Sequence, residues 1–331
     1  MQRFAMSFTR EATHLRQATL RRLYWWVRTT VTLVLAIYLV WRVRAEVGTL
    51  QLHLARPPRL ALALGCVVLA MILSAWLWHV LIPPASRVSF RQLLAHYLLG
   101  FFWNNFLPSG LGGDAVRALA LYNASGRASV AISSVLMARI AGLWSIVLLA
   151  TTAALFYTSS ICWYAALPLL SITIGSLIIT AGGTAFLLGA PMSAFMQRLP
   201  VWLGDWHASL RAYCNQPARL LQALGWAFVI QLCAVAINAF MAQALDLAIT
   251  PSQLLLSMPL INLMVLMPVS LGGFGLREGS YLYFLGLVGV AAADAILLAL
   301  AVYVLLILVA AVGAGICTSL IPHAGTHPDM P

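Results

Sequence analysis

Two short segments of this sequence carry the same polar motif inside long apolar runs. The first, from Pro108 to Arg117, reads Pro-Ser-Gly-Leu-Gly-Gly-Asp-Ala-Val-Arg, and the second, from Pro268 to Arg277, reads Pro-Val-Ser-Leu-Gly-Gly-Phe-Gly-Leu-Arg. Both match P-x-x-L-G-G-x-x-x-R at identical spacing. Five matched positions in apolar sequence seldom arise by chance, so the segments predict an internal repeat. The Pro and Gly residues predict a helix break in each copy.

The residue types of the motif suit the binding of an anion. Pro ends the incoming helix, and the Gly pair exposes backbone N–H groups at the start of the outgoing helix, where the helix dipole favours phosphate. Asp114 is placed to cap that helix, and an arginine in the first turn can bind phosphate through two hydrogen bonds. The candidate substrate-binding residues are Asn104, Asn105, Pro108, Gly112, Gly113, Asp114, Arg117, Arg139, Pro268, Gly272, Gly273, Arg277 and Glu278.

A structural interpretation stands beside the functional one. Asp114 with Arg117, and Glu278 with Arg277, can neutralise each other around a strained turn. Arg139 either makes a lipid-phosphate or proton-linked contact in the cavity, pairs with Asp114 or Glu278, or extends to the membrane surface. We favour a functional role for the motif as a whole, because charges at membrane depth are costly.

Composition shows which elements must position these residues. The chain has 331 residues, of which 62% are hydrophobic and 8% charged, and its mean hydropathy is +0.94. A soluble domain carries about 25% charged residues, so these values predict an all-α polytopic membrane protein. Six apolar runs are long enough to cross a bilayer. The predicted spans are 24–41, 60–82, 130–157, 161–189, 220–243 and 293–320.

Two further apolar stretches, 93–121 and 253–290, are interrupted by the repeated motifs. The arginine-rich N-terminus is expected to be cytoplasmic, and the arginines near 87–91 and 198–219 then fall on the same side. On this topology both interrupted stretches enter and leave on one side, as re-entrant helical hairpins of opposite orientation. Such an inverted repeat is typical of secondary transporters. The loop 42–59 is an exception to the rule that arginine-rich loops face the cytoplasm, since it carries four arginines but is placed outside.

The predicted organisation is a cytoplasmic basic amphipathic tail (1–23), a single transmembrane domain (24–320) and a C-terminal tail (321–331), in a bacterial inner membrane. Within the domain, Asn238 and Gln231 are expected to form hydrogen bonds between helices. Tryptophans such as Trp78 are expected to mark span ends as an aromatic belt.

Charge and cysteine content exclude several classes. The net charge of +11 comes from arginine alone, and it lies beside apolar runs, where it fits an anionic lipid surface rather than nucleic acid, which needs a basic face on a soluble module. The five cysteines are scattered without a CxxC pair, so no metal site or disulfide framework is predicted. We also expect no cofactor and no catalytic residue.

At residues 104–117 and 267–279 the sequence resembles the flippase-like transmembrane region of lysylphosphatidylglycerol synthases. The resemblance covers nearly the whole chain and implies the translocation of a lipid between leaflets. Bifunctional members flip aminoacylated phosphatidylglycerol and add a soluble aminoacyl-transferase domain, which we expect this chain to lack. Relatives usually place an acid before the arginine of the span after the first motif, whereas Ala138 precedes Arg139 here.

Three functions remain open at this point. The first is a flippase or transporter of an anionic, aminoacylated, polyprenyl-type or hopanoid-type lipid. The second is a non-catalytic membrane partner of an enzyme of lipid or glycolipid biosynthesis, and the third is a lipid-modifying membrane enzyme. The expected partners are a membrane lipid substrate and an anionic lipid surface, together with either a lipid-biosynthesis enzyme or a second copy of the chain.

Overall fold

The computed structural model describes residues 56–86, 88–106, 112–157, 163–188, 208–266 and 275–320. Within these ranges the chain is helical, and the elements run in the following order: α2 (Pro57–Leu81), η2 (Pro84–Ser86), α3 (Phe90–Phe106), α4 (Gly112–Ser125), α5 (Ala128–Tyr157), α6 (Trp163–Leu188), η4 (Ala212–Asn215), α9 (Pro217–Ala244), α10 (Pro251–Val265), α11 (Leu276–Leu287) and α12 (Ala292–Leu320). The predicted all-α membrane fold is confirmed.

Four stretches of the described residues are long and apolar enough to cross a membrane: Pro57–Leu81, Ala128–Ala154, Pro217–Ala244 and Ala292–Gly313. They correspond to the spans predicted at 60–82, 130–157, 220–243 and 293–320. The span predicted at 161–189 is the 26-residue helix α6. The span at 24–41 and the two predicted tails lie outside the described residues, so the total of six spans stays a prediction.

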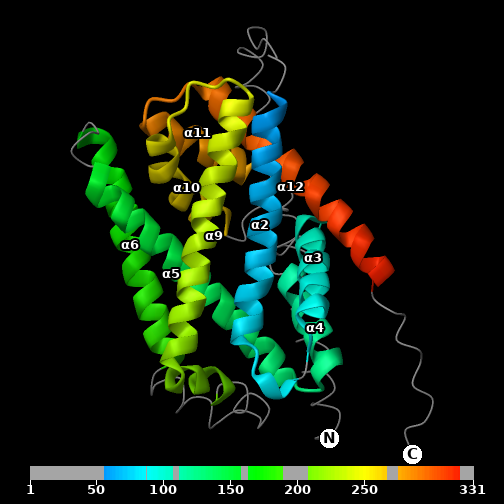
Figure 1. The fold of residues 1–331 in the computed structure, drawn as a ribbon. Coiled ribbons are helices and arrows are strands. Elements are labelled where there is room, and N and C mark those ends of the chain that lie inside the picture. The colour runs from blue at the N-terminus through cyan, green and yellow to red at the C-terminus, as the bar shows by residue number, and fades with distance from the viewer. Residues whose placement is uncertain are drawn as a thin grey trace, which may run out of the picture.

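The helices form a bundle whose two ends are clear in Figure 1. The segments joining α2 to α3 and α4 to α5, and the start of α9, lie at the lower end. The starts of α2, α10 and α12 lie at the upper end, with the end of α9. This is the grouping of loops that the arginine placement predicted.

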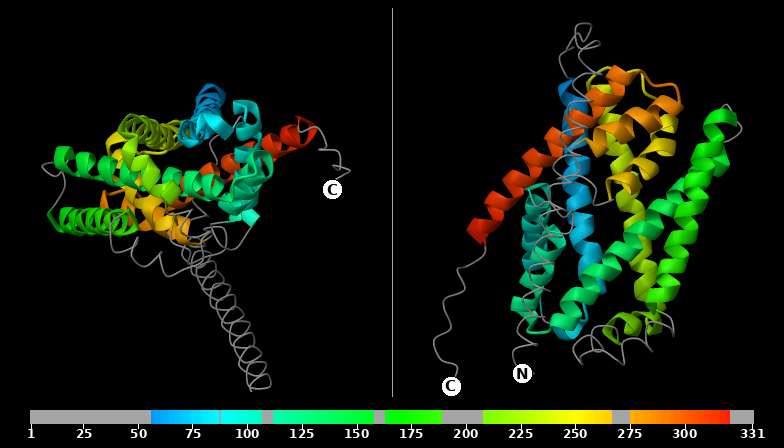
Figure 2. Two further views of the ribbon diagram at one scale, coloured as in Figure 1. Left: turned by 90° about the horizontal axis from the view of Figure 1, so that it is seen from below. Right: turned by 180° about the vertical axis from the view of Figure 1, so that it is seen from behind.

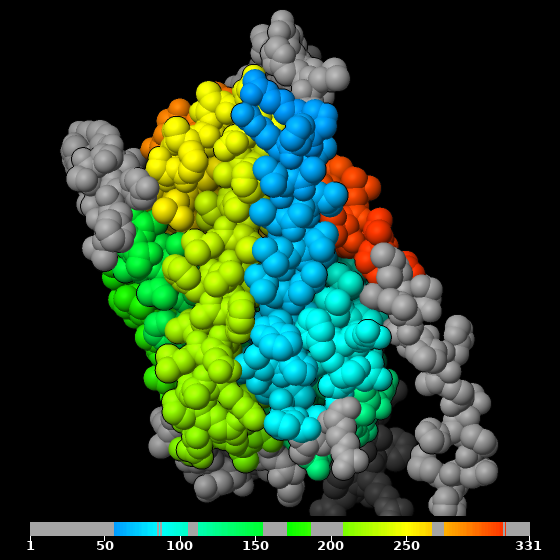
Figure 3. All heavy atoms as spheres, in the orientation of Figure 1, coloured from blue at the N-terminus to red at the C-terminus, as the bar shows by residue number. Residues whose placement is uncertain are grey.

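Long helices make the frame of the bundle. α2 and α9 lie side by side along their length, as Figure 3 shows on one face of the molecule. α12 slants across α2 and packs on α3, which is visible from behind in Figure 2. Large apolar side chains stay exposed on the outside, including Ile179 at 75% and Leu221 at 68%. Exposed large apolar side chains of this kind fit contact with lipid chains.

The two interrupted stretches form two pairs of short helices. α3 packs against α4 in the lower half of the bundle, and α10 packs against α11 in the upper half. α10 begins at a capping box, in which Thr250 Oγ1 accepts the N–H of Gln253 and the Gln253 side chain accepts the N–H of Thr250. Each pair contains one of the two motifs at the break between its helices.

The exception to the arginine rule has a structural explanation. Arg56 forms an ion pair of 2.8 Å with Asp246, and Arg59 Nη1 donates to the carbonyl oxygen of Gln243 over 3.1 Å. Both acceptors lie at the end of α9, where the helix dipole favours a cation. These two arginines therefore have local partners on the side where few arginines are expected.

Tyr213, in η4, joins the lower ends of two spans. Its hydroxyl donates to the carbonyl oxygen of Leu81 at the end of α2 over 2.7 Å, and the residue is 5% exposed. Burial raises the pKa of Tyr213 to about 12, so the hydroxyl keeps its proton at neutral pH. The bond satisfies one of the carbonyls that a helix end leaves without a partner.

Candidate functional site

The first motif sits where two helices approach unusually closely. α4 begins with Gly112 and Gly113, both buried. A Cβ atom at Gly113 would collide with the carbonyl oxygen of Gly100 on α3, and one at Gly100 would lie 2.6 Å from Arg117 Cγ. Glycine at these positions lets the two backbones touch, which brings the start of α4 and its arginine against α3.

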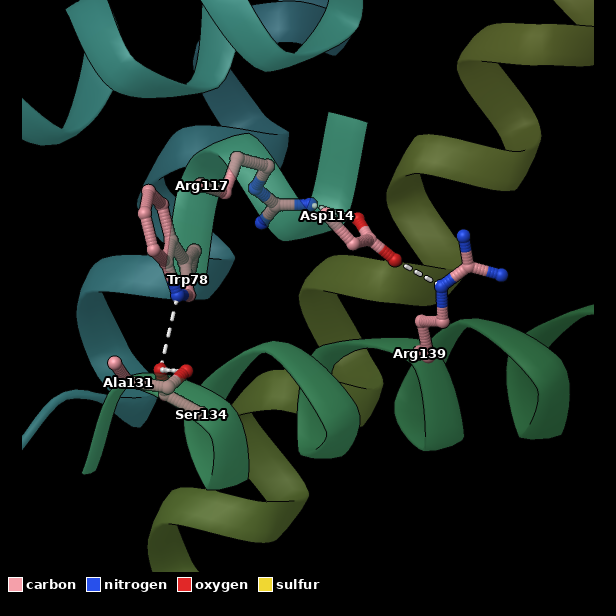
Figure 4. Close-up of polar contacts among 6 residues, drawn as sticks. All are labelled: Trp78, Asp114, Arg117, Ala131, Ser134 and Arg139. Carbon is pink, nitrogen blue, oxygen red and sulfur yellow. Dashed lines mark hydrogen bonds and ion pairs between the residues drawn. The ribbon is translucent and has the colours of Figure 1, made fainter. Parts of the chain in front are cut away.

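A cluster of three charged side chains extends from α4 to α5 (Figure 4). Arg117 Nη1 lies 3.2 Å from Asp114 Oδ1, and Arg139 Nε donates to Asp114 Oδ2. Asp114 thus shares its two oxygens between two arginines. Pairing with Asp114 was one of the alternatives predicted for Arg139, and it is confirmed. Asp114 on α4 thus provides the acidic partner that the preceding residue, Ala138, cannot provide.

The cluster lies deep in the bundle. At 1.5 Å per residue, Arg139 is about 17 Å along α5 from the start of that helix, whereas Trp78, against which Arg117 packs, lies within one turn of the end of α2. The side chain of Arg117 is 12% exposed and that of Asp114 is 19% exposed. Two cations and one anion leave this cluster with one positive charge, in a place where charge is costly.

Arg117 is held between two aromatic rings. Its Cζ lies 4.6 Å from the centre of the Trp78 ring and 4.8 Å from that of Tyr97. Trp78 Nε1 donates to Ser134 Oγ over 3.1 Å, and the hydroxyl of Ser134 donates to the carbonyl of Ala131 (Figure 4). Trp78 lies within one turn of the end of α2, as predicted for a tryptophan that marks a span end, but it is fully buried. It packs against a guanidinium because a flat cation is attracted to the face of an aromatic ring.

The second motif ends in a self-capped helix. Gly275 has a φ of 78°, which favours glycine, and its N–H donates to Glu278 Oε2 over 2.6 Å at the start of α11. Glu278 is 1% exposed. Arg277 instead stacks on the Tyr303 ring of α12, with Cζ 4.4 Å from its centre. Glu278 and Arg277 therefore have different partners, and the structure gives no ion pair between these two described residues.

Several buried polar atoms of the two motifs have no hydrogen-bond partner among the described residues. They are Asn104 Oδ1, Arg117 Nε, Arg277 Nη1 and Glu278 Oε1. An unsatisfied buried polar atom is costly. Two of these atoms are donors and two are acceptors.

A cavity of about 220 Å³ lies between the two pairs of short helices. Residues of α2, α3, α9, α10, α11 and α12 line it, and most of them are apolar. Its polar residues are Tyr97, Asn238, Asn262, Arg277 and Tyr281. Arg277 lines the cavity directly, whereas Arg117 does not line it but stacks on Tyr97, which does. Of the two motif arginines, Arg277 alone therefore faces the cavity.

Hydrogen bonds between helices hold the polar wall of this cavity. Tyr281 OH donates to Asn238 Oδ1 over 2.7 Å, and Asn262 Nδ2 donates to Gln231 Oε1 over 3.0 Å. The prediction that Asn238 and Gln231 join helices is confirmed. Sequence reasoning missed Tyr97, Asn262, Tyr281 and Tyr303, because nothing in the local sequence distinguishes them from other polar or aromatic residues of the spans.

The remaining candidate residues have no described side chain. Pro108, Pro268, Gly272 and Gly273, together with the side chain of Asn105, lie outside the described part of the chain. Among the residues that are described, no group of three or more His, Cys, Asp or Glu side chains is placed to hold a metal ion.

Comparison with known proteins gives one match. The family model described as "Lysylphosphatidylglycerol synthase TM region" matches residues 25–313. No curated protein and no solved structure matches the chain.

Proposed function

Because the chain belongs to the family of the lysylphosphatidylglycerol synthase transmembrane region, we propose that it moves a membrane lipid between the two leaflets. The observation that carries this proposal is the cavity between the two helix pairs, which is lined by Arg277 of the second motif and by Tyr97, the residue on which Arg117 of the first motif stacks. A carrier needs a polar site at mid-membrane that each side can reach in turn, and broken helices provide one.

We interpret α3 with α4, and α10 with α11, as re-entrant hairpins related by an inverted repeat. Their places in opposite halves of the bundle support this interpretation, as does the repeated motif at each break. In the proposed cycle, the helices around one hairpin and then the other separate enough to admit the headgroup. The arginines bind its phosphate, and the apolar lining contacts the first carbons of the lipid chains.

The arginine-rich loops argue for a bacterial inner membrane with the N-terminus in the cytoplasm. Arg91, Arg127 and Arg219 lie within three residues of the starts of α3, α5 and α9, and Arg211 directly precedes η4. The loops before α3 and α5 and the start of α9 lie at the lower end of the bundle in Figure 1, which we assign to the cytoplasmic side. We further propose that the protein is a carrier and not an enzyme. The arginines and amides of the site can bind a phosphate, but they do not form an acid–base pair suited to hydrolysis or transfer.

Reconstitution into proteoliposomes tests the proposal. A lipid with a fluorophore on its acyl chain and an unmodified headgroup is placed in both leaflets, and a membrane-impermeant quencher reports its movement. Wild-type protein is expected to move the lipid, and Arg117→Gln and Arg277→Gln are expected to slow it at least tenfold. Arg127→Gln removes the same charge from an exposed position and serves as the matched control.

Other outcomes point to the other functions. A change in the mass of the lipid after incubation with purified protein would indicate a lipid-modifying enzyme. Full activity of both arginine variants, in vesicles and in cells, would overturn the carrier mechanism and favour a non-catalytic partner of a lipid-biosynthesis enzyme.

A further inference from the structure

A second cavity lies at the lower end of the bundle, between the end of α2 and the start of α9, and we call it the lower cavity. Its volume is about 460 Å³, against about 220 Å³ for the cavity between the two helix pairs. The last two turns of α2, the connection from α2 to α3 and the first two turns of α9 line it. Figure 3 shows these parts of α2 and α9 side by side on one face of the molecule. Among the described residues, none lines both cavities.

Arg219, which lines the lower cavity, has no acidic partner in the part of the chain that the structure describes. The acids in that part are Asp114, Asp246, Glu278 and Asp294. None of them forms an ion pair with Arg219. An arginine keeps its proton throughout the physiological pH range, so an anion in the lower cavity supplies a counter-charge that these residues do not.

The lower cavity lies at the level where a membrane helix meets water. α2, which is long and apolar enough to cross a membrane, ends at Leu81. Trp76 lines the cavity and is exposed. Its ring stacks on His79, with 5.4 Å between the ring centres, and meets the edge of Phe90 at 5.5 Å. Exposed tryptophans favour the boundary between lipid headgroups and lipid chains, so an occupant of this cavity reaches both.

An apolar stripe on α2 leads away from the lower cavity. Leu69, Ile72 and Trp76 are all exposed, and their spacing of three and four residues places them on one face of the helix. Leu221, next to Gln222 on α9, is exposed as well. A lipid chain can cover this stripe while the headgroup occupies the cavity, whereas a soluble phosphate compound leaves the stripe uncovered.

We propose that the lower cavity binds the phosphate of an anionic phospholipid from the leaflet at that end of the bundle. The guanidinium of Arg219 binds the phosphate through two hydrogen bonds, and the amide of Gln222 and the imidazole of His79 add further hydrogen-bonding groups. A zwitterionic headgroup binds less well, because its own ammonium group competes for the phosphate. The site is separate from the cavity between the helix pairs, so the inference goes beyond the proposed function and does not rest on it.

Photolabelling in proteoliposomes locates the bound lipid. The vesicles consist of phosphatidylcholine with a trace of photoreactive phosphatidylglycerol, whose diazirine lies at the start of one acyl chain and whose headgroup is unmodified. Mass spectrometry of the digested protein is expected to find the label on segments 69–88 and 219–222. The labelling should be about fivefold stronger than with photoreactive phosphatidylcholine of the same chains. Glycerophosphoglycerol, the soluble headgroup, is expected not to compete, and competition by it would overturn the proposal in favour of a soluble phosphate compound.

Two variants of the cavity lining test the role of its charge. Arg219→Gln is expected to lower the labelling by phosphatidylglycerol about fivefold. Gln222→Glu adds a negative charge at an exposed position of the lining and should lower it as much through repulsion. Arg91→Gln is the matched control, since Arg91 is exposed near the start of α3 and does not line the lower cavity, and it should keep the wild-type labelling.

Size-exclusion profiles and melting temperatures establish which variants are folded, and Gln222→Glu decides the outcome if Arg219→Gln does not fold. Equal labelling by the two lipids overturns the proposal, as does wild-type labelling of folded Gln222→Glu. Asp205, the acid closest to Arg219 in the sequence, lies outside the described residues. Asp205→Asn is expected to leave the labelling unchanged. A rise would show that this acid is the natural partner of Arg219, and the proposal would be wrong.

Arg277→Gln separates the lower cavity from the proposed transport site. This variant is expected to slow lipid movement but to keep the label on segments 69–88 and 219–222. Loss of that label would mean that the lipid is bound through the cavity between the helix pairs, which would overturn a separate site. Wild-type protein that carries the label but moves no lipid contradicts the proposed function alone, whereas movement of lipid without the label contradicts only this inference.

Discussion

Gly100 of α3 and Gly113 of α4 face each other so closely that neither position has room for a Cβ atom. The contact sets the position of Arg117, because the same approach places the aliphatic part of that side chain against Gly100. The short helix pair is thus a rigid support for a charged residue. Loosening the backbone contact should disturb both stability and the site.

Gly113→Ala is therefore expected to destabilise the protein by about 1–3 kcal/mol, the usual cost of forcing extra atoms into a packed interior. Thermal unfolding in detergent provides the measurement. Gly142→Ala on α5 is the matched control, since an added Cβ there meets no atom within 4 Å, and alanine is the better helix former. Equal melting temperatures for the two variants would contradict the close contact.

Arg117→Lys is expected to lower lipid movement about tenfold, nearly as much as Arg117→Gln. A lysine keeps the charge but loses the flat guanidinium that stacks between Trp78 and Tyr97, and it cannot bind phosphate through a planar fork. The proteoliposome assay measures the rate. Recovery of wild-type transport by lysine would mean that only charge matters at this position.

Glu278→Ala is expected to cost about 0.5–2 kcal/mol, the range for loss of a helix cap. The variant removes the acceptor for the N–H of Gly275, which is buried with Glu278. Hydrogen exchange at the start of α11 should rise along with the loss of stability. Asp294→Ala removes an acid from the first turn of α12 and is the control. A larger loss in that control than in Glu278→Ala would argue against the capping role.

Tyr213→Phe is expected to destabilise the lower end of the bundle by about 1 kcal/mol. The change removes the buried bond from the tyrosine hydroxyl to the Leu81 carbonyl and leaves that oxygen without its donor. Tyr122→Phe deletes a hydroxyl from an exposed residue and should leave the melting temperature unchanged. An unchanged melting temperature for Tyr213→Phe would show that water replaces the lost hydrogen bond.

Properties that depend on local sequence were predictable. The apolar runs of α2, α5, α9 and α12 predict membrane helices, because crossing a bilayer requires a minimum length of apolar residues. The breaks at the two motifs were also predictable, because Pro and Gly interrupt a helix wherever they occur together. The positions of the arginines predicted which loops lie together at each end of the bundle. They did not explain why Arg56 and Arg59 lie at the end where few arginines are expected.

The partners of the charged residues were decided by the tertiary structure. Arg139 has no acid beside it in the sequence, and it pairs with Asp114 only because α4 packs against α5. The sequence predicts only that Trp78 lies near the end of a span. In the structure, α3, α4 and α5 surround it, and its ring packs against Arg117. Contacts of this kind depend on how helices distant in the sequence cross one another. Those crossings are set by the fit of many side chains at once, which no single segment encodes.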